Sequence, residues 1–420
     1  MQSLSPFVIG YMSVEMRDRY RRHFRTLRQY GCNLIHAYNL IDDSDLDNLG
    51  RYETYLNHAL EDGHRVMLDL GGSSLMPRAG GLGHMMRVVN AFRGHPAVAM
   101  WYLCDEPDLR ELPATHPDYN PDQPVGYPVS LMKRFYEAVK VGSPSTPVSV
   151  AFSAENNGMS PIQYRGSYDI QMFDYYPVTV GSDRPEPGIA DCVTLCAKLL
   201  GQHVPTIPIL QGIGQHRSGD RAFPNYIEFR YLSFACLVQA SPEFGGIDGL
   251  LYWSYYRALQ SQGQATWFAT VMSQVCRDVS DFVTIVRPAR DHIVFHSTAF
   301  MDTPEWDAGE PAPSEYIARW TRSRGEYLMV VNNSNQTRAI EVSGVTLGRT
   351  PRNPDMPDCM YCIPRFSTNH SATLTRIGDE YTLSIPDSDP YEVLIYEIID
   401  HPKYSISWLP STTGLLLDPS

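Results

Sequence analysis

Residues 98–107, VAMWYLCDEP, place two carboxylates and a proline directly after an apolar, aromatic-rich run of strand length. A buried strand seldom ends in this way, because an unpaired charge at the edge of a core is costly to remove from water. At the carboxyl end of a barrel strand, however, Asp105 and Glu106 would face a cleft in which acidic groups can act chemically. The position of this run among its neighbours therefore decides between the two interpretations.

Apolar runs of strand length alternate with helical patterns from the start of the chain, which is typical of βα units and a parallel sheet. The eight expected strands are 7–11, 32–38, 65–70, 98–105, 147–152, 168–173, 206–213 and 247–252. Eight such units in roughly 285 residues match the size of a (β/α)8 barrel. An open doubly wound sheet normally has a glycine-rich phosphate turn after its first strand, and residues 10–15, GYMSVE, contain no such turn. We therefore predict an α/β fold of the TIM-barrel type.

The pattern changes after Arg287, where short alternating runs separated by turn residues replace the helical periodicity. These runs are 292–295, 316–320, 327–331, 340–345, 381–385 and 393–398. A period of two, interrupted by turns, predicts a small antiparallel β-sandwich. We therefore divide the chain into a barrel at 1–288, a β-sandwich domain at 289–400 and a C-terminal tail at 401–420.

Charge and hydropathy exclude two classes of partner. The chain of 420 residues has a net charge of −13, so neither nucleic acid nor an anionic membrane surface would be attracted to it. No run of about 18 apolar residues occurs, so we expect no membrane span. The N-terminal residues lack a secretory signal pattern, which indicates either a cytoplasmic protein or a mature secreted one. Asn-X-Ser/Thr triplets at Asn332, Asn335 and Asn369 favour the secreted form.

The cysteines and histidines do not predict a metal centre. Eight cysteines are too few for a disulfide-dense framework in a chain of this length. Cys359 and Cys362 form a single CxxC without a second pair of ligands, so a local disulfide or plain thiols explain them better than zinc. A metal-dependent hydrolase would need clustered histidines or a lysine at a strand end, and the strand ends show neither. We therefore predict no metal and no cofactor.

The active site of a (β/α)8 barrel lies at the carboxyl ends of the strands, so the residues at these ends are the site candidates. Glu106, Asp174 and Asp105 are the candidates for catalysis. The candidates for substrate binding are Tyr11, His36, Tyr38, Asp69, Tyr176, Gln211, Trp253 and Tyr255. Carboxylates, amides and aromatic rings around one opening suit a carbohydrate substrate, because sugars offer hydroxyl groups for hydrogen bonds and apolar faces for stacking.

Four motifs together resemble those of glycoside hydrolases of the clan A type. They are WYLCDEP at 101–107, DYYP at 174–177, ILQG at 209–212 and YWSY at 252–255. The resemblance implies an O-glycosyl hydrolase that acts on an oligo- or polysaccharide, with a general acid/base glutamate at the end of the fourth strand, where Glu106 matches. It also implies a nucleophilic glutamate at the end of the seventh strand. This chain instead has Gln211 there, and no glutamate occurs between Val204 and Asn225.

Because an amide cannot act as a carboxylate nucleophile, three alternatives stay open. In the first, Glu106 is the general acid/base and a second carboxylate, Asp174 or Asp69, is the nucleophile or base. In the second, Glu106 is the acid and the 2-acetamido group of the substrate attacks while Asp105 orients it. In the third, the barrel binds glycans without cleaving them.

The Asp105–Glu106 pair itself has two interpretations. A carboxyl beside Asp105 and among aromatic rings should have a raised pKa, which would let Glu106 hold a proton near neutral pH. Alternatively, one of the pair caps the following loop or pairs with Arg110. Simple alternation along the strand points Asp105 away from Glu106.

Overall fold

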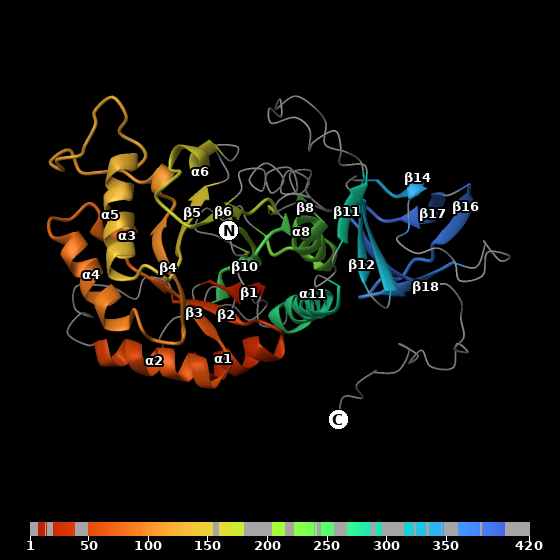
Figure 1. Cartoon of the computed structure of the whole chain (residues 1–420), viewed down its shortest axis with the longest axis horizontal. Helices are drawn as coiled ribbons and strands as arrows, with labels where there is room; N and C mark the ends of the chain where they lie inside the picture. The colour runs from red at the N-terminus through yellow and green to blue at the C-terminus, as the bar shows by residue number, and fades with distance from the viewer. Residues whose placement is uncertain are drawn as a thin grey trace.

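The computed structural model describes two β-rich lobes, a barrel surrounded by helices and a smaller lobe of antiparallel sheets (Figure 1). The described residues are 7–12, 14, 20–37, 49–153, 159–179, 204–214, 222–238, 240–241, 245–255, 267–286, 291–295, 315–322, 325–332, 336–345, 347, 360–378 and 380–399.

Eight parallel strands close into a barrel in the order β1-β10-β7-β6-β5-β4-β3-β2, which confirms the predicted TIM barrel. The strands are β1 (Val8–Tyr11), β2 (Leu34–Ala37), β3 (Arg65–Asp69), β4 (Val98–Asp105), β5 (Val148–Ser153), β6 (Ile170–Tyr175), β7 (Thr206–Gln211) and β10 (Gly249–Trp253). The longer helices are α1 (Tyr20–Gln29), α2 (Leu49–Glu61), α4 (Gly81–Phe92), α5 (Val129–Gly142), α8 (Tyr226–Val238) and α11 (Ser273–Ile285). Shorter elements are α3 (Gly72–Leu75), η2 (Pro107–Leu109), α6 (Met159–Gln163), η5 (Phe268–Met272) and the pair β8 (Ala240–Ser241) and β9 (Gly245–Gly246).

Side chains of the barrel strands form two buried layers. The inner layer consists of Val8, Met12, Leu34, Met67, Met100, Tyr102, Ala151, Ile170, Met172, Ile207, Ile209 and Leu251. Outward-facing residues such as Ile9, Ile35, Trp101 and Leu210 pack with the helices in a larger cluster. Because the inner layer fills the barrel, chemistry is confined to its carboxyl end.

Strand β4 carries a bulge just before its carboxyl end. It pairs with β5 as Tyr102 with Ser149 and then Cys104 with Val150, so the register shifts by one residue at Leu103. Leu103 and Cys104 both belong to the outer, helix-facing layer. A bulge of this kind re-aims the residues that follow it. Asp105 consequently lies on the same side of the strand as Tyr102, which simple alternation does not predict.

The second lobe contains two antiparallel sheets, which confirms the predicted β-sandwich. One has the order β11-β12-β13-β18-β15 and the other β14-β17-β16. The strands are β11 (Asp291–Phe295), β12 (Glu315–Arg322), β13 (Gly325–Asn332), β14 (Arg338–Val345), β15 (Tyr361–Arg365), β16 (Thr373–Ile377), β17 (Glu380–Ser388) and β18 (Val393–Ile399). Residues of both sheets, among them Val330, Ile340, Leu383 and Leu394, form one apolar cluster. The strands β15 and β16 were not predicted, and the exact domain boundaries stay a prediction.

Helix α8 lies between the two lobes and contacts β12, β13 and β18 (Figure 1). Every residue from Glu228 to Val238 is buried, because the helix is covered by the barrel and by the second domain. Arg230 is the main polar link. It pairs with Asp278 of α11 at 2.9 Å and donates to the carbonyl oxygen of Phe366 in the second domain. The barrel and the sandwich therefore share a buried contact that includes a charge.

Asn332 corrects one sequence-based expectation. Its side chain is buried, and its amide nitrogen donates to the carbonyl oxygens of Gln336, Ser388 and Asp389. An amide held in this way cannot carry a glycan, so this triplet gives no support for secretion. Asn335 lies outside the described residues.

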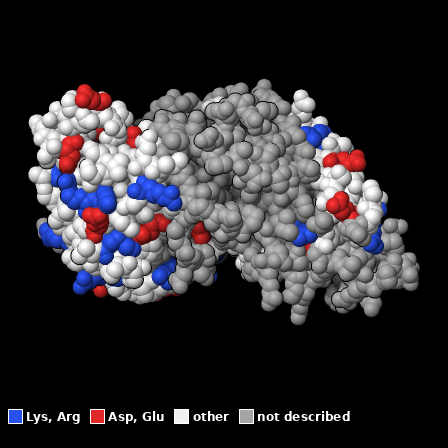
Figure 2. All heavy atoms as spheres, turned by 45° about the horizontal axis from the view of Figure 1, so that its top comes forward, with Lys and Arg blue, Asp and Glu red and all other residues white. Residues whose placement is uncertain are grey.

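Three further observations concern the surface and the thiols. Cys362 is a free thiol whose pKa is raised by burial to about 12, and Cys359 lies outside the described residues. On the face shown in Figure 2, blue and red side chains are interspersed over the described part of the barrel. No helix among the described residues is long and apolar enough to cross a membrane.

Candidate active site

Glu106 follows the last residue of β4 and has an unusual backbone conformation. Its φ of 44° and ψ of 57° lie in the left-handed region, which costs a non-glycine residue about 1–2 kcal/mol. Pro107 further disfavours helical values for the residue before it. The backbone is held on both sides, since Glu106 N donates to Ala151 O at 2.9 Å and Glu106 O accepts from Leu109 N at 3.0 Å. Such conformations persist where the surroundings fix them, and they cluster at functional sites.

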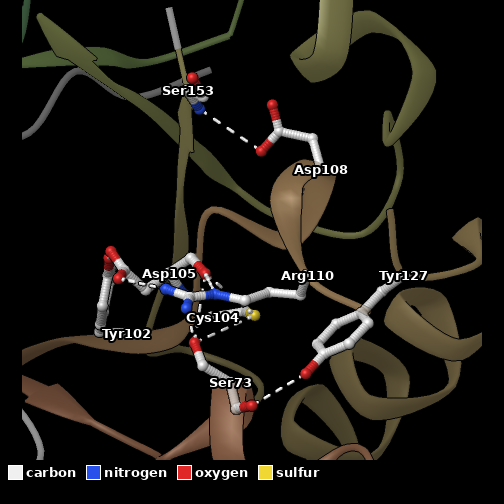
Figure 3. A network of polar contacts seen from close by, with 8 residues as sticks. All are labelled: Ser73, Tyr102, Cys104, Asp105, Asp108, Arg110, Tyr127 and Ser153. Carbon is white, nitrogen blue, oxygen red and sulfur yellow. Dashed lines mark hydrogen bonds and ion pairs between the residues drawn. The ribbon is translucent and has the colours of Figure 1, made fainter. Parts of the chain in front are cut away.

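The carboxylate of Asp105 is engaged by two side chains of the protein (Figure 3). Its Oδ1 accepts a hydrogen bond from the Tyr102 hydroxyl at 2.6 Å. Its Oδ2 forms an ion pair with Arg110 Nη2 at 2.8 Å. Of the alternatives considered for the Asp105–Glu106 pair, the ion pair with Arg110 is therefore present, and it involves Asp105.

The backbone of Asp105 is held by the turn that follows β3. Strand β4 continues past Tyr102, the last of its residues to pair with β3, where its partner is Asp69. Ser73 takes the place of the missing strand, because its Oγ accepts from Asp105 N at 3.0 Å and donates to Asp105 O at 3.2 Å. Gly72 allows this approach, since a Cβ atom there would lie 1.8 Å from the carbonyl oxygen of Leu103.

Asp174, at the carboxyl end of β6, is half-buried and lies in the electrostatic field of the β4 carboxylates. Burial raises its pKa well above the ordinary value, and the negative charges of Asp105, Glu106 and Asp108 raise it further. A hydrogen bond with Tyr176 lowers the pKa, but by less. Among the described residues Asp174 Oδ1 has no hydrogen-bond partner. Burial and the neighbouring carboxylates therefore both disfavour ionisation of Asp174.

Asp108 is a site residue that sequence reasoning missed. It is buried within η2, and its Oδ1 accepts from the backbone nitrogen of Ser153 at 3.4 Å (Figure 3). Its charge contributes to the raised pKa of Asp174. The one signal in the sequence was its position, two residues after Glu106 in the same strand-end loop.

The aromatic candidates divide between the two layers of the barrel. Tyr176 and Trp253 are half-buried and pack against the inner layer at its carboxyl end. Tyr11 and Tyr255 instead belong to the outer, helix-facing layer, with ring centroids 5.9 Å apart. The hydroxyl of Tyr255 is hydrogen-bonded to His23 Nδ1 at 2.8 Å. Tyr11 and Tyr255 are thus core residues and do not reach the inner side of the barrel.

Gln211 ends β7 at the place where the resemblance implies a nucleophile. Its side chain is fully buried, and Oε1 accepts from Val178 N at 2.7 Å. Its Nε2 donates to the carbonyl oxygens of Val178, Ala222 and Ile213 at 2.9, 2.7 and 3.2 Å. This pattern of one donor and three acceptors fixes the orientation of the amide. Gln211 therefore ties together the segments after β6 and β7.

His36 and Asp69 lie deeper in the barrel than Glu106. His36 is buried on β2 with its ring 4.5 Å from that of Tyr102, and burial lowers its pKa to about 3. It is therefore neutral at physiological pH. Asp69 Oδ1 accepts from Gly71 N at 2.7 Å, which stabilises the turn after β3. Tyr38 lies outside the described residues.

Potential metal ligands come together in the second domain. Atoms of His370, Asp389 and Glu392 lie within 4.8 Å of one another. Glu392 is already used within the protein, because Oε1 pairs with His370 at 3.3 Å and Oε2 accepts from Asp389 N at 2.9 Å. These contacts stabilise the loop that contains Asp389 and Glu392, and we assign no catalytic role to the three residues.

Comparisons with known proteins place the fold. No protein-family profile and no curated protein matches the sequence. Among solved structures, a glycoside hydrolase family 5 enzyme from Bacteroides vulgatus has a TM-score of 0.58 at 10% identity, with 94% of this chain and 89% of that chain covered. An alpha-amylase from Geobacillus thermoleovorans complexed with acarbose has a TM-score of 0.52 at 9% identity, with 95% and 99% covered. A debranching enzyme from Nostoc punctiforme has a TM-score of 0.52 at 10% identity, with 94% and 100% covered.

Identities this low establish the fold alone. The resemblance predicted from the four motifs is confirmed at that level: this chain has the fold of glycoside-hydrolase barrels.

Proposed function

We propose that this protein is a glycoside hydrolase that cleaves O-glycosidic bonds of an oligo- or polysaccharide, with Glu106 and Asp174 as its two catalytic carboxylates. The observation that carries the proposal is the placement of Asp174 at the carboxyl end of β6 and of Glu106 directly after β4, both at the catalytic end of a closed barrel. The negative charge of Glu106 helps to raise the pKa of Asp174. Two carboxyl groups in such a position are what hydrolysis of a glycosidic bond requires.

The resting proton of the pair is assigned to Asp174. Hydrolysis by two carboxyl groups needs one protonated group to donate to the leaving oxygen and one ionised group to act as nucleophile or base. The raised pKa of Asp174 makes it the proton donor, and Glu106 is then the ionised partner. This assignment reverses the roles expected from the sequence motif, because burial and three neighbouring carboxylates act on Asp174.

The geometry supports this pair over the two other carboxylate schemes. Both oxygens of Asp105 are engaged by Tyr102 and Arg110, which makes Asp105 a poor group for orienting a 2-acetamido substituent. One oxygen of Asp69 is engaged in the turn after β3. Gln211 offers no carboxylate, and a glutamate in its place would turn an oxygen toward the carbonyls that now accept from Nε2.

Sugar binding is assigned to Trp253 and Tyr176. Both are half-buried at the carboxyl end of the barrel, so part of each side chain is accessible there. Tyr176 is hydrogen-bonded to Asp174, and its ring therefore lies next to the proposed proton donor. Aromatic faces stack on the apolar faces of sugars, and we assign the two residues to sugar binding on that ground.

The test is digestion of a glycan panel by the wild-type protein and by E106Q, D174N and E137Q, with products identified by mass spectrometry. Glu137 is an exposed helix residue paired with Lys133, so E137Q is the matched control. We expect E106Q and D174N to lose about 10²–10⁴-fold in rate and E137Q to match the wild type. With an aryl glycoside whose leaving group needs no proton, D174N should regain activity and E106Q should not.

Other outcomes contradict the proposal in different ways. Wild-type protein that binds glycans but releases no product is a binding protein. E106Q with the wild-type rate would remove Glu106 from the mechanism. Activity confined to 2-acetamido sugars and blocked by a thiazoline mimic would favour substrate assistance over the carboxylate pair.

A further inference from the structure

We infer that Arg110 is a positioning residue for Glu106, which it places by holding and neutralising Asp105. The inference rests on the proposed catalytic pair. Arg110 acts through Asp105, to which it is hydrogen-bonded twice.

Arg110 holds Asp105 by both its backbone and its side chain. Its Nε donates to Asp105 O at 2.9 Å, and its Nη2 donates to Asp105 Oδ2 at 2.8 Å. The planar guanidinium can make both bonds at once, which an ammonium group cannot do with the same geometry. Figure 3 shows the arginine side chain extended along the end of β4 toward Asp105. Two bonds to one residue fix its position and its orientation.

The residue held in this way directly precedes Glu106. The amide nitrogen of Asp105 is fixed by Ser73, its carbonyl by Arg110 and Ser73, and the amide nitrogen of Glu106 by Ala151. The left-handed conformation of Glu106 therefore starts from a peptide with no freedom to rotate. Loss of the Arg110 bonds would let this peptide relax and would displace the Glu106 carboxylate.

Arg110 also changes the charge that Asp174 experiences. The charged and titratable groups that act on Asp174 are Asp105 and Glu106 from the end of β4, Asp108 from η2 and Tyr176 from its own strand end. Arg110 is ion-paired with the first of these. The guanidinium side chain is about one-third exposed at 35%, whereas the Asp105 side chain is 12% exposed, so the pair is only partly screened by solvent.

Two substitutions should therefore shift the titration of Asp174 in opposite directions. R110M leaves the Asp105 charge uncompensated and should raise the pKa of Asp174. D105N removes one of the charges that raise this pKa and should lower it. The double variant D105N/R110M removes both charges and should return the titration close to that of the wild type.

The experiment follows the Asp174 carboxyl directly by ¹³C NMR of protein labelled at aspartate side chains, with D174N identifying the resonance. We expect shifts of about one pH unit, upward in R110M and downward in D105N. Shifts in the same direction, or no shift in either variant, would overturn the inference. Because the measurement needs no turnover, it remains informative if the wild-type protein cleaves no glycan, which is the failure of the proposed function.

The positioning role is tested separately with R110K, which retains the positive charge but not the two-bond geometry. We expect the Asp174 titration to be unchanged in R110K while kcat falls at least tenfold and KM changes little. Unchanged kcat in R110K would overturn the positioning role.

The matched control is R134M. Arg134 on α5 pairs with Asp118 at 2.8 Å, the same distance as in the Arg110 pair, and its side chain is exposed. R134M should leave both the Asp174 titration and kcat unchanged. Circular dichroism of each variant separates loss of fold from loss of position, and R110K and D105N keep the test intact if R110M does not fold.

Discussion

Two arginine–aspartate pairs of nearly equal length have different surroundings in this protein. Arg110 and Asp105 lie 2.8 Å apart at the carboxyl end of the barrel, and Arg230 and Asp278 lie 2.9 Å apart at the contact between the domains. The Arg230 side chain is 5% exposed, against 35% for Arg110. Burial lowers the pKa of Arg230 and raises that of Asp278, so desolvation destabilises the charged form of both partners.

The two arginines share a second feature, a bond to a backbone carbonyl at or beside a left-handed residue. Among the described residues, the non-glycine residues with positive φ are Glu106, Phe366, Ser367 and Tyr391. Arg110 donates to the carbonyl just before Glu106, and Arg230 donates to the carbonyl of Phe366 itself. The same device thus fixes a chemical group in one region and joins two domains in the other. The comparison indicates that the burial of an ion pair, more than its length, determines how much it contributes to the free energy of unfolding.

The largest effect on stability should come from breaking the buried pair. R230M leaves Asp278 without its partner in the interface and removes the bond to Phe366. We expect the free energy of unfolding to fall by about 3–5 kcal/mol. Chemical denaturation monitored by far-UV circular dichroism measures this. A loss as small as that of R110M would show that burial does not distinguish the two pairs.

A smaller effect, of opposite sign, should follow from D174N. The folded-state pKa of Asp174 is raised above that of the unfolded chain, so unfolding releases a proton between the two pKa values and stability falls as pH rises through this window. D174N removes that dependence and should stabilise the protein by about 1 kcal/mol at pH 7. Melting temperatures measured from pH 3 to pH 8 should show the gain disappearing near pH 4. A constant gain at all pH values would contradict the charge argument.

The smallest effect on stability is expected for R110M. A partly exposed pair contributes about 1 kcal/mol or less, so the free energy of unfolding should fall by no more than this. The same denaturation experiment used for R230M provides the comparison. A loss of several kcal/mol in the free energy of unfolding would mean that Arg110 is chiefly a structural residue. A fall in the activity of R110M would then report on folding and not on the position of Glu106.

Much of the fold was predictable because βα alternation is a long-range signal repeated eight times. The layer to which a strand residue belongs was less predictable. Barrel strands are apolar on both faces, so the residues that flank Tyr11 and Trp253 in the sequence do not reveal which ring faces inward. The structure assigns Trp253 to the inner layer and Tyr11 to the outer one. Short strands such as β15 carry too little alternation to be recognised.

At the site, the sequence located the strand ends better than it described the surroundings of the side chains there. Asp174 lies at the carboxyl end of β6 and Glu106 follows β4, as expected, and their catalytic roles stay a prediction. The bulge at Leu103, however, turns Asp105 toward Tyr102, and no local motif marks it. The raised pKa of Asp174 is due first to its burial, which the sequence pattern does not reveal.

The left-handed backbone of Glu106 means that this position is subject to two opposing selections. Glycine adopts a φ near 44° without steric cost, so E106G would relieve backbone strain. The backbone conformation therefore favours glycine at position 106, and only the chemistry of the carboxylate favours glutamate. Selection for thermal stability alone should enrich glycine at position 106, whereas selection for turnover should retain glutamate. A library randomised at codon 106 and sorted separately for stability and for turnover would therefore show whether glutamate is kept there for its chemistry.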